Sequence, residues 1–218
     1  MCTLEKMDKF FENRLSGYDE HMRECIEGAN EFYKFTASLL PLNENCKILD
    51  LGCGTGLELE EYFKINPAAN VTGVDLSAAM LGELSKKFPD KKMNLINDSY
   101  FDTDFGKGVY NAAVSVESLH HFTEEQKLSL YKKLRSALTA DGYFILTDYF
   151  AESPFHEKEY FRILNKLKIE QNISDDAFYH YDTPLTVEHE TEILLKAGFS
   201  DIKILNRWGA TFTLKATR

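Results

Sequence analysis

Residues 48–57 read Ile-Leu-Asp-Leu-Gly-Cys-Gly-Thr-Gly-Leu, and this stretch decides the fold. An apolar run is interrupted by Asp50, and Gly52, Gly54 and Gly56 then alternate with other residues before a helical segment. Glycine permits positive φ angles and lets the backbone approach a ligand closely. The N–H groups at the start of the next helix point toward the same ligand. The stretch therefore predicts a strand, a ligand-binding glycine loop and a helix.

Short apolar runs alternate with helical segments along the rest of the chain, which predicts a parallel α/β sheet with helices on both faces. Two closing runs, separated by a turn near Trp208 and Gly209, predict a terminal hairpin and hence an antiparallel edge. The predicted strands are 47–51, 70–75, 93–96, 110–116, 143–147, 201–205 and 210–214. The predicted helices are 3–14, 21–40, 57–65, 77–88, 123–138, 155–171 and 186–196.

The chain is acidic, with 25 Lys and Arg against 35 Asp and Glu among 218 residues, a formal net charge of −10. This charge disfavours nucleic-acid binding that relies on phosphate neutralisation. No run approaches the roughly 20 apolar residues that span a bilayer, and the charged start of the chain is unlike a signal peptide. We therefore expect a cytoplasmic protein that does not bind membranes.

The cysteines and histidines give no sign of a metal site in the sequence. Cys2, Cys25, Cys46 and Cys53 are far apart and form no Cys-x-x-Cys motif. The spacing of His156, His180 and His189 is not that of metal ligands. The expectation from sequence is reduced thiols and no metal.

Two cofactor classes compete for the glycine loop. A dinucleotide site has the pattern G-x-G-x-x-G, whereas this loop is G-x-G-x-G with Leu57 in place of the third glycine. The Asp50 carboxylate would repel a pyrophosphate and attract a cation. S-adenosyl-L-methionine carries a sulfonium and an ammonium group, so its charge suits the loop better than that of a nicotinamide dinucleotide.

Two further carboxylates follow strand ends. Asp75 lies 19 residues after Gly56, where a short carboxylate can accept hydrogen bonds from both ribose hydroxyls. Ser77 can cap the next helix, so Asp75 is not needed for that role. Asp98 could accept a hydrogen bond from an adenine amine, or it could be a solvated turn residue.

The sequence resembles the class I S-adenosylmethionine-dependent methyltransferases across roughly residues 40–150. The matching segments are ILDLGCGTG at 48–56, GVDLS at 73–77, Asn97-Asp98, NAAVSVESLHHF at 111–122 and ALTADGYFILTD at 137–148. The resemblance implies a Rossmann-like sheet of seven strands in the order 3-2-1-4-5-7-6, with strand 7 antiparallel. It also implies methyl transfer from S-adenosyl-L-methionine, with S-adenosyl-L-homocysteine as the product.

The resemblance also assigns roles to residues. Backbone groups of Gly52 and Ser115 would hold the ammonium group, Asp75 the ribose and Asp98 the adenine. Tyr18 would reach the cofactor carboxylate, or it packs between helices. The candidate cofactor-binding residues are Tyr18, Asp50, Gly52, Cys53, Gly54, Gly56, Asp75, Leu76, Met80, Asn97, Asp98, Ser99, Ser115, Val116 and Glu117.

His120 and His121 are the candidate catalytic residues. They follow the fourth predicted strand, at the sheet edge where ligands of α/β proteins bind. Methyl transfer needs mainly proximity and orientation, and it needs a base only if the acceptor loses a proton. One histidine could be that base or contact the acceptor, or both could belong to a packing turn. Glu117 is either a contact near the sulfonium or a polar loop residue.

One domain is expected. The aromatic residues of 150–185 suit a lid over an acceptor or, alternatively, an apolar helix face that covers the edge of the sheet. The acceptor is expected to be a small molecule, and the oligomeric state is open, a homodimer being one option. The predicted parts of the domain 1–218 are an N-terminal helical cap (1–40), a cofactor-binding core (41–150), an acceptor lid (151–185) and a C-terminal helix and hairpin (186–218).

A narrower resemblance concerns residues 185–217, which are similar to the end of the carboxy-S-adenosylmethionine synthases that serve wobble-uridine modification in tRNA. In those enzymes an arginine upstream of this region secures the extra carboxylate. Asp175 takes that position here beside Asp176, and no arginine lies between Arg162 and Arg207. An unpaired carboxylate there would be destabilised, so ordinary S-adenosylmethionine is preferred. A non-catalytic S-adenosylmethionine-binding module is a third hypothesis.

Overall fold

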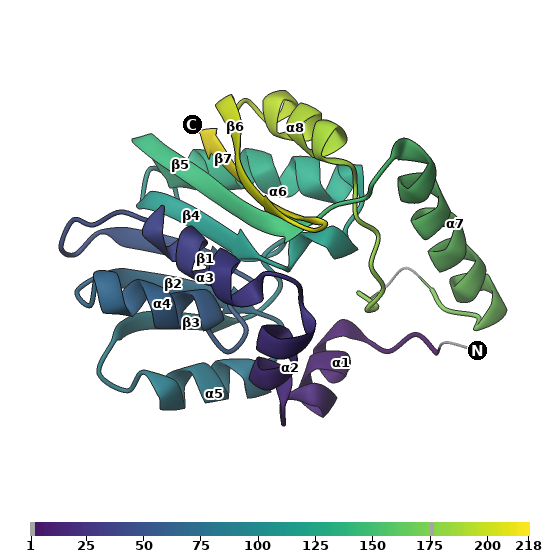
Figure 1. Ribbon diagram of the computed structural model, residues 1–218, viewed down its shortest axis with the longest axis horizontal. Coiled ribbons are helices and arrows are strands. Elements are labelled where there is room, and N and C mark those ends of the chain that lie inside the picture. The colour runs from purple at the N-terminus through teal and green to yellow at the C-terminus, as the bar shows by residue number, and fades with distance from the viewer. Residues whose placement is uncertain (1–2, 175–176) are drawn as a thin grey trace.

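The computed structural model describes residues 3–174 and 177–218, so Cys2, Asp175 and Asp176 lie outside the described residues. Its seven-stranded sheet has the order β3-β2-β1-β4-β5-β7-β6 (Figure 1). β7 is antiparallel to both of its neighbours and the other pairs are parallel, which confirms the predicted fold class. The strands are β1 (Lys47–Leu51), β2 (Asn70–Asp75), β3 (Lys92–Asn97), β4 (Tyr110–Val116), β5 (Leu138–Tyr149), β6 (Ser200–Trp208) and β7 (Thr211–Thr217).

Helices cover both faces of the sheet (Figure 1). Side chains alternate between the faces, so Ile48 packs with α3, α4 and α5, whereas Leu49 and Leu51 pack with α6 and α8. The helices are α1 (Met7–Arg14), α2 (Tyr18–Cys25), α3 (Ala29–Ser38), α4 (Leu57–Ile65), α5 (Ala78–Lys87), α6 (Glu124–Ala137), α7 (Pro154–Glu170) and α8 (Val187–Lys196), with a 3-10 turn η1 (Leu119–His121). None of the described helices combines the length and apolar character needed to cross a bilayer.

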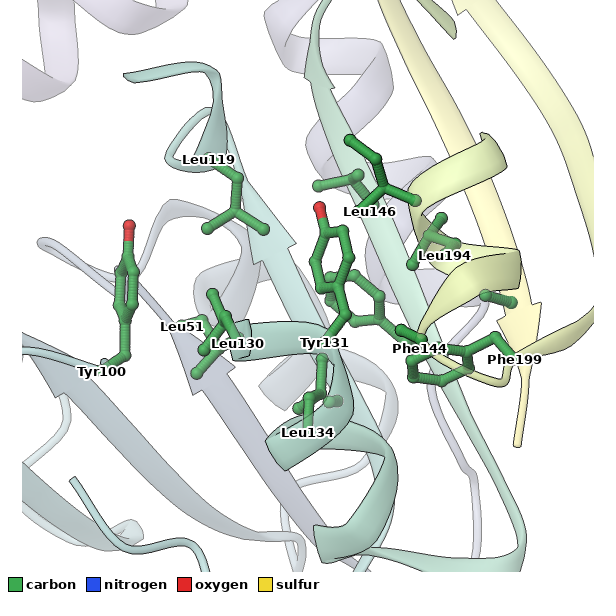
Figure 2. Packing of buried hydrophobic residues seen from close by; sticks show 14 of the residues in the cluster. Leu51, Tyr100, Leu119, Leu130, Tyr131, Leu134, Phe144, Leu146, Leu194 and Phe199 are labelled. Atoms are coloured by element: carbon green, nitrogen blue, oxygen red, sulfur yellow. The ribbon is translucent and has the colours of Figure 1, made fainter. Parts of the chain in front are cut away.

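The α6 side of the core is built around Tyr131, which is fully buried. Figure 2 shows this ring beside Phe144 of β5, with Leu194 of α8 close by and Leu130 toward Leu51 of β1. Thr123 caps α6 through a reciprocal capping box with Gln126. The cap fixes the start of α6 directly after η1, the turn that carries both candidate catalytic histidines.

A buried ion pair joins α6 to α8. Lys127 Nζ lies 2.5 Å from Glu190 Oε2, and the Tyr131 hydroxyl donates to the other oxygen of the same carboxylate. Lys127 is 1% exposed and Glu190 is 0% exposed. Each charge therefore depends on the other, because water cannot solvate either group.

The predicted single helix over 21–40 is wrong, because the structure has two helices, α2 and α3, in this region. The chain turns at Gly28, whose φ is +75°, and a Cβ there would lie 2.6 Å from the Cβ of Trp208. Gly28 precedes α3 and lets the C-terminal hairpin approach closely there, and local periodicity carries no sign of that contact.

The predicted helix over 3–14 begins only at Met7. Lys6 forms an isolated antiparallel bridge with Tyr179, and Met7 N–H donates to Phe178 O at 2.9 Å. The start of the chain is therefore held against the 178–180 segment. β5 also starts earlier than predicted, at Leu138, directly after α6.

Candidate functional site

The glycine loop and the end of β2 are joined by one carboxylate. Gly54 N–H donates to Asp75 Oδ2 and Ser77 N–H donates to Asp75 Oδ1, each at 2.8 Å. Burial raises the pKa of Asp75, although these two backbone donors act to lower it. Both oxygens keep lone pairs on the open side, so Asp75 can still accept hydrogen bonds from a ligand.

Gly52 can have no side chain. Its φ is +72°, and a Cβ there would lie 2.0 Å from Ser118 Oγ. Gly52 N–H donates to Val74 O at 2.8 Å, which fixes the loop against β2. The missing side chain at Gly52 therefore leaves room for Ser118 beside the loop. Gly56 also has a positive φ, +75°, and it starts α4.

Two buried acids lie behind the loop. Asp50 is 1% exposed, and neither of its carboxylate oxygens has a hydrogen-bond partner among the described residues. Glu58 Oε1, on α4, also lacks a partner among the described residues. Burial, together with the negative charge of Glu58, raises the pKa of Asp50 well above its usual range. Carboxylates left in this state favour a cation nearby, because a positive charge would stabilise their ionised form.

A small cavity of about 50 Å³ lies in front of Asp75. It brings together eight of the predicted site residues from four parts of the chain. Met7 and Phe11 of α1, which the sequence did not single out, close it on one side. The lining residues are Met7, Phe11, Tyr18, Gly52, Gly54, Asp75, Leu76, Met80, Tyr100, Glu117, Ser118 and His121.

The Asn97–Ser99 turn does not line this small cavity. Asp98 is exposed, and its Oδ1 accepts from Ser99 N–H at 2.8 Å. Asn97 donates from Nδ2 to the carbonyl oxygens of Asp75 and Leu76. The turn is therefore anchored to the end of β2, next to the Asp75 carboxylate.

Four other residues that were predicted to contact the cofactor are buried beneath the site: Gly56, Cys53, Ser115 and Val116. The Cys53 side chain packs under Gly73, where a Cβ would lie 2.7 Å from the sulfur, and burial raises the pKa of its thiol. Ser115 Oγ donates to Leu51 O at 2.9 Å, and Val116 is 8% exposed. These side chains support the loop from below.

A second, larger cavity of about 780 Å³ adjoins the first. Phe11, Tyr18, Glu117 and His121 line both cavities, so the two meet at these residues. α1 and α2, the ends of β4 and β5, the 180–182 segment and the β6–β7 turn all contribute. Its lining includes Phe10, Arg14, His21, His120, Tyr149, His180, Asp182, Trp208 and Thr211.

The two candidate catalytic histidines differ in their electrostatic environment. His120 Nδ1 lies 2.6 Å from Asp148 Oδ1, whose other oxygen accepts from Leu119 N–H. Burial opposes protonation of His120, but the carboxylates of Asp148 and Asp182 outweigh it and raise its pKa to about 10. Burial and the charge of His120 lower the pKa of His121 well below its usual range. His121 is therefore the neutral member of the pair.

Glu117 lies where the two cavities meet. It is a non-glycine residue with a φ of 48°, and its Oε1 accepts from Thr211 Oγ1 at 2.9 Å. Burial and the charge of Asp148 raise its pKa to about 7, while His120 opposes the rise. Glu117 thus changes charge near neutral pH at the centre of the site.

The sequence analysis did not single out Asp148, Asp182 or Ser118, and it named His180 only as one of three histidines without the spacing of metal ligands. Asp148 follows the same rule as Asp50 and Asp75, because it lies at the carboxyl end of a parallel strand, and this rule could have found it. Asp182 and His180 lie in a segment without regular structure, where no spacing indicates a site. Ser118 is identified only by its approach to Gly52.

Comparisons with known proteins agree with this arrangement. Residues 48–142 match the protein family described as "Methyltransferase domain". The carboxy-S-adenosyl-L-methionine synthase of Nautilia profundicola is 26% identical, over 96% of this chain and 94% of that protein. The phosphoethanolamine N-methyltransferase of Plasmodium falciparum is 25% identical, over 80% of this chain and 61% of that protein.

Solved structures share the fold at low sequence identity. A putative O-methyltransferase of Nostoc punctiforme superimposes with a TM-score of 0.70 at 20% identity, over 99% of this chain and 62% of that one. The 1,6-didemethyltoxoflavin-N1-methyltransferase of Burkholderia thailandensis, with bound 1,6-didemethyltoxoflavin and S-adenosylhomocysteine, has a TM-score of 0.63 at 17% identity. That match covers 96% of this chain and 87% of the other.

Proposed function

We propose that this chain is a class I S-adenosylmethionine-dependent methyltransferase and that it methylates a small molecule bound in the larger cavity. The observation that carries this proposal is the junction of the two cavities at Phe11, Tyr18, Glu117 and His121. In-line displacement requires the donor carbon and the acceptor atom to meet in one geometry. A volume of about 780 Å³ lies in the range of small-molecule sites.

The residues around the small cavity suit S-adenosylmethionine, whose bound sulfonium supplies an activated methyl group. Asp75 would accept hydrogen bonds from the ribose hydroxyls, and the bare backbone at Gly52 would hold the ammonium group. Asp50, with both oxygens unpartnered among the described residues, and Glu58, with Oε1 unpartnered, lie behind the loop and line neither cavity. A positive charge on the ligand would favour their ionised forms from that distance. The roles of Asp98 at the adenine and of Ser115 at the ammonium belong to the same proposal.

His121 is the better candidate for direct contact with the acceptor. It is neutral at physiological pH and lines both cavities, whereas His120 is held in an ion pair with Asp148. Its ring nitrogen can therefore offer a lone pair at the point where the methyl group is transferred. Among the described residues, α7 lines neither cavity, so the contribution of 151–185 to a lid rests on His180 and Asp182.

Synthesis of carboxy-S-adenosylmethionine is the second candidate, because a relative of that name aligns over nearly the whole chain. The extra carboxylate would need a cation. Arg14 is the one arginine that lines either cavity in the described structure, and it already pairs with Glu5 at 2.8 Å. Glu117 and Asp182 add negative charge to the larger cavity. Ordinary S-adenosylmethionine therefore remains the preferred cofactor.

Thermal unfolding with S-adenosylhomocysteine, S-adenosylmethionine and NAD in parallel tests the cofactor. At about 100 times Kd a ligand adds roughly 2.7 kcal/mol, which raises Tm by about 5–10 °C in a chain of this size. We expect this rise with the two adenosyl ligands and none with NAD. A rise with NAD alone would refute the proposal.

Catalysis is tested by release of S-adenosylhomocysteine over a panel of small-molecule acceptors. Turnover supports the methyltransferase, whereas cofactor binding without turnover over the whole panel favours a non-catalytic binding module. Mass spectrometry of the ligand released on denaturation separates the two cofactors, because the carboxylated form is heavier. Recovery of that form would favour the synthase.

The pKa of Glu117 predicts a pH-dependent affinity. Glu117 is neutral below about pH 7 and ionised above it, and the ionised form attracts a sulfonium. The affinity for S-adenosylmethionine should therefore rise by up to about tenfold from pH 6 to pH 8. Isothermal titration at several pH values measures this rise, and Glu117→Gln, which keeps an acceptor for Thr211, should flatten the profile. The same slope in both proteins would contradict the assignment.

A further inference from the structure

Three imidazole rings converge on one carboxylate oxygen at the edge of the larger cavity. Asp182 Oδ1 lies 3.3 Å from His121 Nδ1, 3.6 Å from His120 Nε2 and 4.0 Å from His180 Nε2. The two segments that carry these residues are fixed to each other, because Thr183 N–H donates to His120 O at 2.8 Å. The cluster is therefore a built feature, formed by segments about 60 residues apart in the sequence.

The distances within the cluster indicate whether direct hydrogen bonds hold it together or whether its atoms are spaced as the ligands of a metal ion. Good N–H···O hydrogen bonds have N···O distances of about 2.7–3.2 Å, so 3.3 and 3.6 Å are long for direct bonds. Two ligand atoms at about 2.1 Å from a tetrahedral ion lie roughly 3.4 Å apart. The separations of His121 and His120 from Asp182 match this second spacing. One nitrogen of each ring and one oxygen of Asp182 lie within 4.8 Å of one another.

Asp148 supplies the support that metal-binding histidines commonly have. His120 Nδ1 lies 2.6 Å from Asp148 Oδ1, which leaves Nε2 directed toward Asp182. A carboxylate on the far nitrogen orients the ring and makes the near nitrogen a stronger ligand. Asp148 is itself held, because its second oxygen accepts from Leu119 N–H at 2.9 Å.

The cluster is closed on the protein side and open to the cavity. The side chains of His120 and His121 are 9% and 3% exposed, whereas that of Asp182 is 49% exposed. All three residues line the cavity of about 780 Å³. An ion held by three protein ligands with a fourth position toward a cavity has the arrangement of catalytic zinc sites.

We propose that His120, His121 and Asp182 bind one divalent transition-metal ion, such as zinc, at the acceptor side of the cavity. Two imidazole nitrogens and one carboxylate oxygen form a donor set that zinc accepts readily. His180, stacked on Phe10 at 3.4 Å between ring centroids, flanks the site. The ion takes the place of the hydrogen on His120 Nε2, which passes to solvent. His121 Nδ1 also gives up its contact with Tyr181 O at 3.3 Å, and the hydrogen of that ring is then carried on Nε2.

The chemical class of the acceptor follows from this site, and this step rests on the proposed methyl transfer. An acceptor with a thiol or hydroxyl group would coordinate the open position and lose its proton to solvent, because the ion stabilises the anion. The acceptor would then be activated by coordination to the ion, and it would not need to transfer a proton to His121. The anion attacks the sulfonium methyl carbon, the carbon–sulfur bond breaks, and its electron pair stays on sulfur as S-adenosylhomocysteine forms.

Titration of the full chain, without an affinity tag and stripped with a chelator, tests the site. Cobalt(II) is the probe, because its visible absorption reports a low coordination number. We expect one equivalent to bind with this spectrum and to be displaced by zinc. Asp182→Asn should weaken binding at least tenfold, and so should His121→Ala. Asp148→Asn should weaken it about 10- to 100-fold.

His156→Ala is the matched control, because His156 is a half-exposed histidine on α7 and lines neither cavity. It should bind cobalt as the unaltered protein does. Asp182 is exposed, so Asp182→Asn should fold, and its Tm without metal verifies this. Binding weaker than about 100 μM, or equal binding by the Asp182 and His156 variants, would overturn the proposal. Because no turnover is measured, that outcome leaves the proposed methyl transfer intact.

Discussion

Asp75→Ala should raise the Kd for S-adenosylhomocysteine by about 10- to 100-fold. Hydrogen bonds to a charged group contribute about 1.5–3 kcal/mol each, and Asp75 is the carboxylate that lines the small cavity beside Gly54. The variant also frees Gly54 N–H, so the loop that surrounds the ligand becomes less well ordered. Isothermal titration gives the Kd, and Tm without ligand shows that the protein still folds.

Asp104→Ala is the matched control for this substitution. Asp104 Oδ1 also accepts a turn N–H, from Gly106 at 2.9 Å, but Asp104 is exposed and lines neither cavity. Its removal should leave the Kd unchanged. If Asp75→Ala binds as tightly as Asp104→Ala does, Asp75 does not belong to the cofactor site.

Lys127→Met should lower the free energy of unfolding by about 3–5 kcal/mol, because it leaves the Glu190 carboxylate buried without its cation. In a chain of this size that loss corresponds to a fall in Tm of roughly 6–20 °C. Thermal and urea unfolding measure it. The double variant Lys127→Met/Glu190→Gln should recover much of the loss, because it removes the buried charge and keeps an acceptor for Tyr131.

Lys196→Met is the matched control for Lys127→Met, because it also removes a lysine from an ion pair that joins α6 to α8. Lys196 Nζ of α8 lies 2.9 Å from Glu124 Oε1 of α6, but the Lys196 side chain is 52% exposed. Water screens this pair, so its loss should have little effect on Tm. Equal effects of the two lysine substitutions would show that burial does not set the strength of the Lys127 pair.

Much of the fold could be predicted from residues close together in the sequence. The alternation of apolar runs and helical segments predicted the strands of the parallel sheet and the helix over 123–138. The order of the strands came from family resemblance, because local patterns do not state which strands are neighbours. The break between α2 and α3 was missed, and the close approach of Trp208 to Gly28 is a contact with the other end of the chain that local periodicity does not state.

The cofactor side of the site was predictable for the same reason. Gly52, Gly54 and Asp75 lie at strand ends, where the fold itself places a ligand. The acceptor side of the site depends on which segment without regular structure folds over the carboxyl ends of the strands. Asp182 and His180 reach the histidines of η1 only in the folded chain, so their chemistry is invisible to spacing arguments.

The small volume of the cofactor cavity has a kinetic consequence. About 50 Å³ holds no more than a few water molecules, so binding of an adenosyl ligand at the proposed site would require α1, with Met7 and Phe11, to lie further out. Phe11 also lines the larger cavity, so one displacement would serve both substrates. We would then expect the first helix to govern the order of addition and the rate at which spent product leaves, independently of how fast the bond-making step itself proceeds.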